Sequence, residues 1–172
     1  MIRQILISLS IASLSLLQLS CFQVKAKDPV VFRFVPGKTA LLKDGYAYAP
    51  RRAPKQVVAA IAAGNRLQGK PYKWGGGHAR HNDTGYDCSG SVSYVLREAG
   101  IIKGSMASRA FLHYGKRGEG KWITIYSRNG HVFMTVAGLR LDTGGRGQRD
   151  GPKWKPWKRE SKGYIMRHPP GL

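Results

Sequence analysis

The hydrophobic pattern of this chain changes its period near Gly120, and this change restricts the fold more than any other feature. Before Gly120, apolar residues recur at helical spacing in residues 54–68 and in a second segment that runs from Cys88 to Gly100. After it, apolar and polar residues alternate as they do in half-buried strands. The alternating segments are residues 121–127, 131–138, 139–143 and 163–169. Helices followed by an antiparallel sheet predict an α+β domain.

Residues 1–26 are predicted to form a secretory signal peptide and not part of this domain. Arg3 precedes an uncharged apolar run at residues 5–19, and cleavage is expected after Ala26. Two alternatives are an uncleaved membrane anchor and a lipid attached to Cys21. The signal peptide predicts export to the periplasm or to the outside of the cell, in association with the wall.

The rest of the chain has room for one domain of ordinary size. Residues 27–54 are rich in proline and are predicted to form an arm over the domain, with one short edge strand at most. Residues 55–172 form the predicted domain itself. Within it, residues 144–162 read as a basic loop that carries Trp154 and Trp157, which either stack on a sugar or pin the loop to the domain.

The chain is strongly basic, with a formal net charge of +20. Cleavage after Ala26 removes Arg3 and Lys25 but no acid, which leaves 27 basic and 9 acidic residues and a charge of +18. Such a surface attracts polyanions. Outside the cell these are acidic wall polymers and anionic lipid head groups, so nucleic acid is not an expected partner. We expect a monomer without stable membrane insertion after cleavage.

Cys88 becomes the single cysteine of the chain once Cys21 is removed, so it cannot belong to an internal disulfide. It is either a buried bystander or a reactive thiol. The start of the second predicted helix favours the reactive thiol, because unsatisfied N–H groups at a helix N-terminus stabilise a thiolate. Asp87 is placed to cap this helix.

A nucleophilic thiolate needs a general base and a group that orients the base. His131 begins a predicted strand after the Asn129-Gly130 turn, and Asp142 stands eleven residues later on the next strand. A turn near Gly138 would make His131 and Asp142 neighbours across a hairpin. Taken singly, His131 reads as a surface histidine and Asp142 as a solvated strand end. Together with Cys88 they predict a Cys-His-Asp catalytic site.

Three segments resemble the successive signatures of the NlpC-type papain-like cysteine peptidases of bacterial cell walls. They are "PYKWGGG", "YDCSGSVSYVLREAGI" and "GHVFMTVAGLRLDT", and the resemblance covers roughly residues 55–143. It implies a papain-like α+β fold with helices packed on a C-terminal antiparallel sheet.

The resemblance also implies a function. Cys88 would attack an amide of a peptidoglycan stem peptide, usually the bond that joins γ-D-glutamyl to a diamino acid, with His131 as the base. Tyr72 would lie beside the thiol, and Asp87 and Ser89 would shape the substrate pocket. No cofactor is implied.

The chain departs from the family pattern in three respects. The third catalytic position is most often His, Asn or Gln, whereas here Asp142 falls there about one residue early, with His168 as the fallback. No recognisable wall-binding repeat accompanies the domain, so targeting would rest on the charge. Residues 144–162 have no counterpart that can be placed.

Metal and nucleotide sites are not predicted. Residues 75–77 are glycines without the Lys-Ser or Lys-Thr of a phosphate loop. His78, His81 and Asp83 match none of the common zinc spacings. The remaining alternatives to a stem-peptide hydrolase are an acyltransferase or amidase on another wall or lipid amide, and a non-catalytic basic module that binds polyanions.

Overall fold

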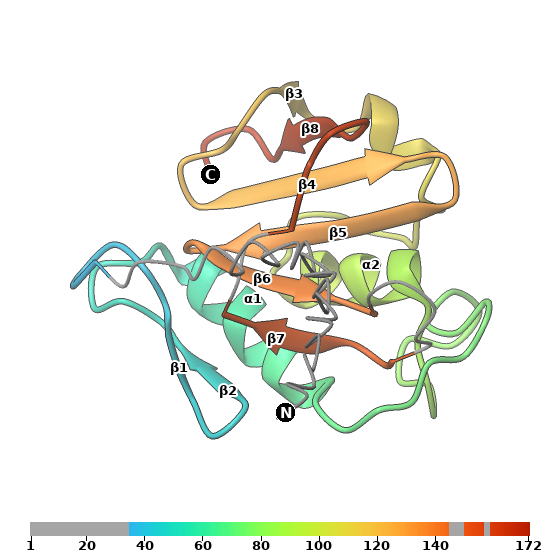
Figure 1. Cartoon of the computed structure of the whole chain (residues 1–172), viewed down its shortest axis with the longest axis horizontal. Helices are drawn as coiled ribbons and strands as arrows, with labels where there is room; N and C mark the ends of the chain where they lie inside the picture. Colours follow the sequence, from blue (N-terminus) through green and yellow to red (C-terminus); the bar gives the residue numbers. More distant parts are fainter. Residues whose placement is uncertain (1–34, 145–149, 157–158) are drawn as a thin grey trace, which may run out of the picture.

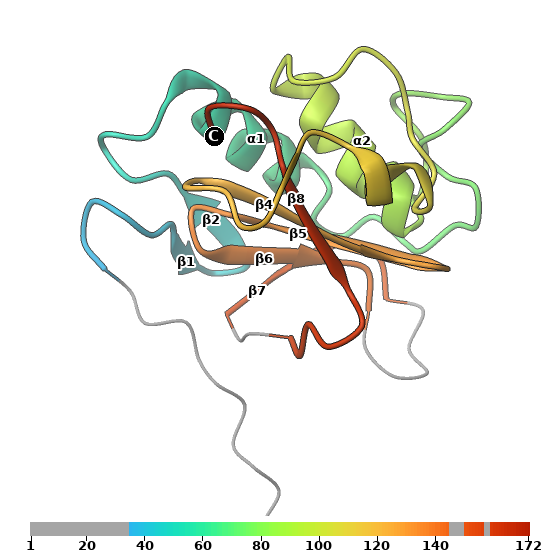
Figure 2. The ribbon, with the colours of Figure 1, turned by 90° about the horizontal axis from the view of Figure 1, so that it is seen from above.

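Two helices cover one face of a six-stranded antiparallel sheet in the computed structural model of this chain (Figure 1 and Figure 2). The structure describes residues 35–144, 150–156 and 159–172. The predicted signal peptide, Cys21 and Trp157 lie outside the described residues. Within them, no helix combines the length and the apolar character needed to cross a bilayer. The α+β architecture expected from the change of period is confirmed.

The sheet has the strand order β3-β8-β4-β5-β6-β7, and every neighbouring pair is antiparallel. Its strands are β3 (Lys116–Arg117), β4 (Ile123–Arg128), β5 (His131–Val136), β6 (Leu139–Asp142), β7 (Lys153–Lys155) and β8 (Ile165–His168). Strands β4, β5 and β6 follow one another directly in the chain and form the centre of the sheet. The C-terminal strand β8 pairs with β3 and β4.

The helices are α1 (Lys55–Arg66) and α2 (Cys88–Glu98), and a short 3-10 helix, η1 (Ala110–His113), follows them. Helix α1 begins after Pro54, as the sequence predicts, because proline fits the start of a helix. Alternate residues of the central strands, such as Ile123, Ile125, Val132 and Met134, are buried beneath the helices in one apolar core. This core fixes which face of each strand is left for polar side chains.

Residues 41–48 form a separate hairpin of β1 (Leu41–Lys43) and β2 (Tyr46–Tyr48), which differs from the single edge strand expected in the arm. Asp44 and Gly45 join the strands, and both have positive φ angles of 50° and 82°. A two-residue turn of this kind matches the twist of a hairpin. The hairpin lies against α1 (Figure 1), where the Asn65 side chain bonds to both the N–H and the C=O of Ala47, at 2.8 and 2.9 Å.

Strand β7 occupies part of the segment that the sequence assigns to a basic loop. It pairs with β6 through Leu141 and Trp154, and the Trp154 side chain is buried. The indole N–H donates to Asn65 Oδ1 at 2.9 Å, and the ring lies over Gly64, where an added Cβ would come within 2.3 Å of it. Trp154 therefore pins this segment to α1 and is not available to stack on a ligand.

Asn65→Ala should destabilise the fold, because Asn65 joins α1, the hairpin and β7. Its loss leaves the Trp154 indole N–H and the main chain of Ala47 without their partners, at a cost of about 1–3 kcal/mol. Chemical denaturation measures this difference in the free energy of unfolding. The exposed Asn82→Ala is the matched control and should change it by less than ~0.5 kcal/mol. Equal stability of the two variants would contradict the role of Asn65.

Candidate active site

Cys88 is the first residue of α2, and its thiol is half-buried and free. The Asp87 carboxylate caps the helix as predicted, with Oδ1 accepting from the Gly90 N–H at 2.6 Å. This contact leaves other N–H groups of the first helical turn without an intrahelical acceptor, so they can stabilise negative charge. The thiol therefore lies beside donors that can stabilise an oxyanion.

A glycine-rich loop packs directly on this first turn of α2. Asp87 Oδ2 accepts from the Gly75 N–H at 3.0 Å. A Cβ added to Gly90 would lie 1.9 Å from the Gly76 carbonyl oxygen, so only glycine permits this approach. The contact thus needs a glycine at the third position of α2.

His131 begins β5, and its Nε2 lies 3.0 Å from Asp142 Oδ1. The strands β5 and β6 are joined by Ala137 and Gly138, both with positive φ, in the tight turn that the sequence predicts. This register sets Asp142 on the same face as His131, one diagonal step away across the ladder. The Cys88 thiol lies close enough to the His131 ring to raise the pKa of the imidazole. The structure therefore brings the three predicted residues together.

The charges of the site are set by burial and by close partners. Burial opposes protonation of His131, but hydrogen bonds with Asp142 and Cys88 outweigh it and raise the pKa of the imidazole. Burial disfavours the charged form of Asp142, yet His131 and Arg159 hold the pKa of this carboxyl below its usual range. Asp142 is therefore ionised and can only accept hydrogen bonds, so Nε2 of His131 carries the donated proton.

Arg159 is a site residue that the sequence did not reveal. Its Nη1 donates to Asp142 Oδ2 at 2.8 Å and to the Gly144 carbonyl at 3.1 Å. Its guanidinium also lies over the Phe133 ring, 5.6 Å from the centroid. In the sequence it is one of several cations near Trp154, and no spacing distinguishes it from them.

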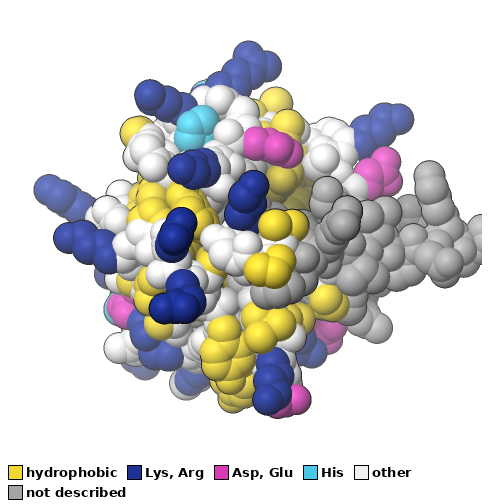
Figure 3. Space-filling model, turned by 90° about the vertical axis from the view of Figure 1, so that its left-hand side faces the viewer, with side chains coloured by type: hydrophobic (Ala, Val, Ile, Leu, Met, Phe, Trp, Pro, Cys, Tyr) yellow, Lys and Arg dark blue, Asp and Glu magenta, His cyan; other side chains and the backbone are white. Residues whose placement is uncertain are grey.

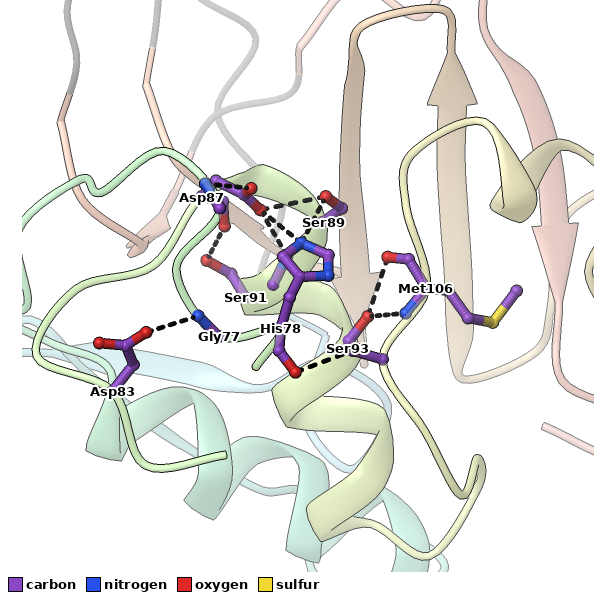
Figure 4. Close-up of polar contacts among 11 residues, drawn as sticks. Gly77, His78, Asp83, Asp87, Ser89, Ser91, Ser93 and Met106 are labelled. Carbon is purple, nitrogen blue, oxygen red and sulfur yellow. Dashed lines mark hydrogen bonds and ion pairs between the residues drawn. The ribbon is translucent and has the colours of Figure 1, made fainter. Parts of the chain in front are cut away.

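Asp87 and Ser89 are both buried, and His78 packs against them (Figure 4). His78 Nε2 lies 3.2 Å from Asp87 Oδ1 and 3.1 Å from Ser89 Oγ, and the Ser89 hydroxyl donates to Asp87 Oδ1 at 3.0 Å. Figure 4 shows the imidazole turned toward the start of α2. Tyr72 forms an isolated parallel bridge with Tyr86, two residues before the thiol.

The histidines near this loop have separate polar partners. His78 contacts Asp87, whereas His81 bonds to Glu98 and stacks on the Tyr94 ring, with the centroids 4.8 Å apart. Among the residues that the structure describes, no group of three or more His, Cys, Asp or Glu side chains is placed to hold a metal ion.

His168, the fallback for the third position, lies away from His131. Its Nδ1 faces the Gly118 carbonyl at 3.1 Å. It pairs with Lys116, while His131 pairs with Arg128 at the other end of β4. The two are separated along the sheet by about four residues of strand, or ~13 Å. The geometry thus favours Asp142.

Comparisons with known proteins find the same family that the sequence motifs suggest. A model described as the NlpC/P60 family matches residues 69–137. The chain is 29% identical over 126 residues to peptidoglycan DL-endopeptidase CwlO of Bacillus licheniformis, which covers 64% of this chain and 28% of that protein.

Two solved structures from Trichomonas vaginalis are also similar. NlpC1 has a TM-score of 0.50 at 18% identity and covers 68% of this chain and 45% of its own. NlpC2 has a TM-score of 0.48 at 17% identity and covers 68% and 48%. The likeness to NlpC1 supports the papain-like α+β fold. The chain spans less than half the length of each of these relatives.

Gly90→Ala should disturb the site, because the added Cβ must displace the main chain of Gly76. We expect a loss of stability of about 1–3 kcal/mol, as for other overpacked positions. Thermal unfolding measures it. Gly104→Ala is the matched control, since a Cβ there meets nothing within 4 Å. If both variants unfold at the same temperature, the loop does not pack on α2 as described.

Proposed function

We propose that the chain is a cysteine peptidase that hydrolyses an amide bond in peptidoglycan stem peptides, because residues 69–137 match the model of the NlpC/P60 family. The observation that carries the proposal is the chain of contacts from the Cys88 thiol through His131 to Asp142. The name of the Bacillus relative, a peptidoglycan DL-endopeptidase, supports the substrate. The bond proposed for cleavage is the one between γ-D-glutamyl and a diamino acid, as the sequence resemblance implies.

The proposed reaction has two steps that share one base. The Cys88 thiolate adds to the amide carbonyl, and the N–H groups at the start of α2 stabilise the oxyanion. The His131 imidazolium then gives its proton to the leaving amine, which leaves a thioester on Cys88. Water attacks the thioester, His131 takes a proton from it, and the acid product departs with the thiolate restored.

Asp142 has the role of orienting the base. Because its ionised Oδ1 accepts from Nε2–H, the ring presents Nδ1 to the thiol. Arg159 holds Oδ2 of the same carboxylate and so fixes its rotation. The pair Asp142–Arg159 keeps the imidazole in one tautomer and one orientation.

Tyr72, Asp87 and Ser89 remain the proposed contacts of the substrate pocket. The buried bonds of Asp87 to Gly75 and Gly90 suit a residue that shapes the loop beside the thiol. The bridge to Tyr86 holds Tyr72 close to the start of α2. Direct contact with substrate is part of the proposal.

We further propose that the protein is exported and is retained by anionic polymers of the envelope. Lysine and arginine side chains outnumber acidic ones on the face drawn in Figure 3. In the described part of the chain, Lys38, Arg51 and Arg52 line an open hollow of about 600 Å³ together with Pro36 and Gly37. Such a cluster of cations attracts phosphate or carboxylate groups at moderate ionic strength.

Cys88→Ala should abolish the release of muropeptides from purified peptidoglycan, with a fall in rate of about 10³-fold or more. Mass spectrometry of the released peptides measures the rate and identifies the bond. Val58→Ala, an exposed change on α1, is the control and should keep full activity. Undiminished release by Cys88→Ala would reject the proposal.

Related measurements distinguish the hydrolase from an acyltransferase and from a polyanion-binding module. An acyltransferase would need Cys88 but would transfer the acyl group to an added amine instead of to water. A polyanion-binding module would bind peptidoglycan without cutting it, and its thiol would react slowly with an alkylating reagent near neutral pH.

Asp142→Asn should lower kcat/KM by ~10²-fold or more and move its alkaline limb to lower pH. That limb follows the loss of the imidazolium form, and Asp142 helps raise the pKa of His131 above its ordinary value of 6.5. Without the carboxylate this pKa falls, so activity is lost at lower pH. A pH–rate profile tests the shift.

Asp44→Asn in the exposed hairpin turn is the matched control for this change. It should leave both the rate and the limb in place. An alkaline limb that stays fixed in Asp142→Asn would show that the carboxylate does not act on His131.

A further inference from the structure

The helices α1 and α2 lie on one face of the sheet (Figure 2). A cavity of about 340 Å³ lies on the opposite face, and its lining comes from residues 119–122, from β4, β5 and β6 with Gly138 between them, and from Arg159 and Ser161. The side chains that matter below are Thr124, Tyr126, Phe133, Thr135, Arg140 and Arg159. None of the described helices contributes to it.

Arg140 is a buried cation in the wall of this cavity. Its neighbours Leu139 and Leu141 belong to the core, so the alternation of β6 turns Arg140 to the opposite face. It is 4% exposed, and its Nε has no hydrogen-bond partner in the described part of the chain. The nearest acceptor is Asp142 Oδ2, at 3.7 Å. A buried guanidinium nitrogen without a hydrogen-bond partner is costly to keep, which points to an absent partner.

Arg159 brings a second guanidinium to the same cavity. Its Nη1 already bonds to Asp142 Oδ2 at 2.8 Å. Two cations therefore share one carboxylate, which leaves one positive charge in the wall without compensation. The other charged residues of the lining, Glu119 and Lys121, are exposed at the rim and balance each other.

Hydroxyl groups complete a set of donors around the two arginines. Thr124 is buried, and its Oγ1 accepts from the Gly120 N–H at 3.0 Å, so its own proton is left to donate. Thr135 lines the cavity beside it, on the neighbouring strand. Forked guanidinium donors combined with hydroxyl donors match the geometry of an oxyanion.

We propose that this cavity is a binding site for an oxyanion, a carboxylate or phosphate group held by Arg140 and Arg159. The ligand is a small acidic group or the end of a larger anionic molecule, since the cavity opens to solvent at Lys121 and Glu119. Wall polymers carry both carboxylate and phosphate groups, and the experiment below distinguishes between these two groups. The site lies beside the thiol site and is distinct from it, because no residue of the Cys88 helix lines it.

The site is joined to the proposed catalytic residues through Asp142. An oxyanion on Arg140 and Arg159 would share their charge with the Asp142 carboxylate, which orients His131. Binding should therefore weaken the hold of Arg159 on Asp142 and reduce the rate. This consequence rests on the proposed function, whereas the binding itself does not.

Binding is measured on the full chain carrying Cys88→Ala, so that no hydrolysis interferes. Inorganic phosphate and acetate are titrated by calorimetry at constant ionic strength, as the probes for phosphate and carboxylate groups. We expect saturable one-site binding of at least one probe, and the tighter probe identifies the source. Arg140→Gln should weaken it by about tenfold or more.

Arg109→Gln is the matched control, because Arg109 is exposed and carries the same charge. It should leave the affinity unchanged, which excludes a general effect of the basic surface. Arg140→Lys keeps the buried charge but loses the forked donors, and should weaken binding severalfold if Arg140→Gln does not fold. Absence of saturable binding in the parent, or equal affinity in the Arg140 and Arg109 variants, would overturn the proposal.

The effect on rate is tested separately in the active chain. If phosphate binds but does not slow muropeptide release, the proposed coupling through Asp142 is wrong, whereas the proposed binding site is supported. If the chain releases no muropeptide at all, the proposed function fails while the calorimetric result still decides the site.

Discussion

The charge of Asp142 is the constraint on which the rest of the site depends. Its side chain has no exposed surface, and an ionised carboxylate is stable there only when both oxygens are paired. Oδ1 meets the His131 ring and Oδ2 meets Arg159. The same contacts that make the charge tolerable also fix the imidazole, so the stability of the sheet face and the orientation of the proposed base have one physical cause.

A second buried carboxylate organises the opposite side of the thiol. Asp87 caps α2 at Gly90 and holds the glycine-rich loop at Gly75. Because Gly90 carries no side chain, the loop can approach the helix closely enough for these bonds. The thiol thus lies between two elements, a capped helix and a strand start, whose positions are each set by an aspartate.

The sequence predicted the site better than it predicted the connections between elements. Cys88 and His131 stand at the starts of elements, where a change of period locates them, and the short turn at Gly138 brings Asp142 next to His131. The N-terminal hairpin is indicated by its turn, since Asp44-Gly45 between two short strands is typical of a tight hairpin turn.

Other features could not be predicted from sequence. Strand β7 has only three residues, which are too few to show an alternation of apolar and polar side chains. Trp154 lies in this strand because its side chain packs on α1. Arg159 reaches Asp142 across seventeen residues of chain, and no local pattern encodes such a contact.

Two of the three departures from the family pattern, the acid at the third catalytic position and the segment 144–162, explain each other. The resemblance implies a neutral or weakly basic side chain at the third catalytic position, whereas this chain has a carboxylate there. A buried carboxylate needs positive charge beside it, and a His, Asn or Gln at that position would not. Arg159 supplies this charge from the segment 144–162 that has no counterpart in the family pattern, and Arg140 adds a second cation from the strand itself. Replacing the acid by a neutral residue would leave the buried Arg140 and the partly exposed Arg159 without their shared counter-ion. The acid and the basic segment therefore stabilise each other through the Asp142–Arg159 ion pair.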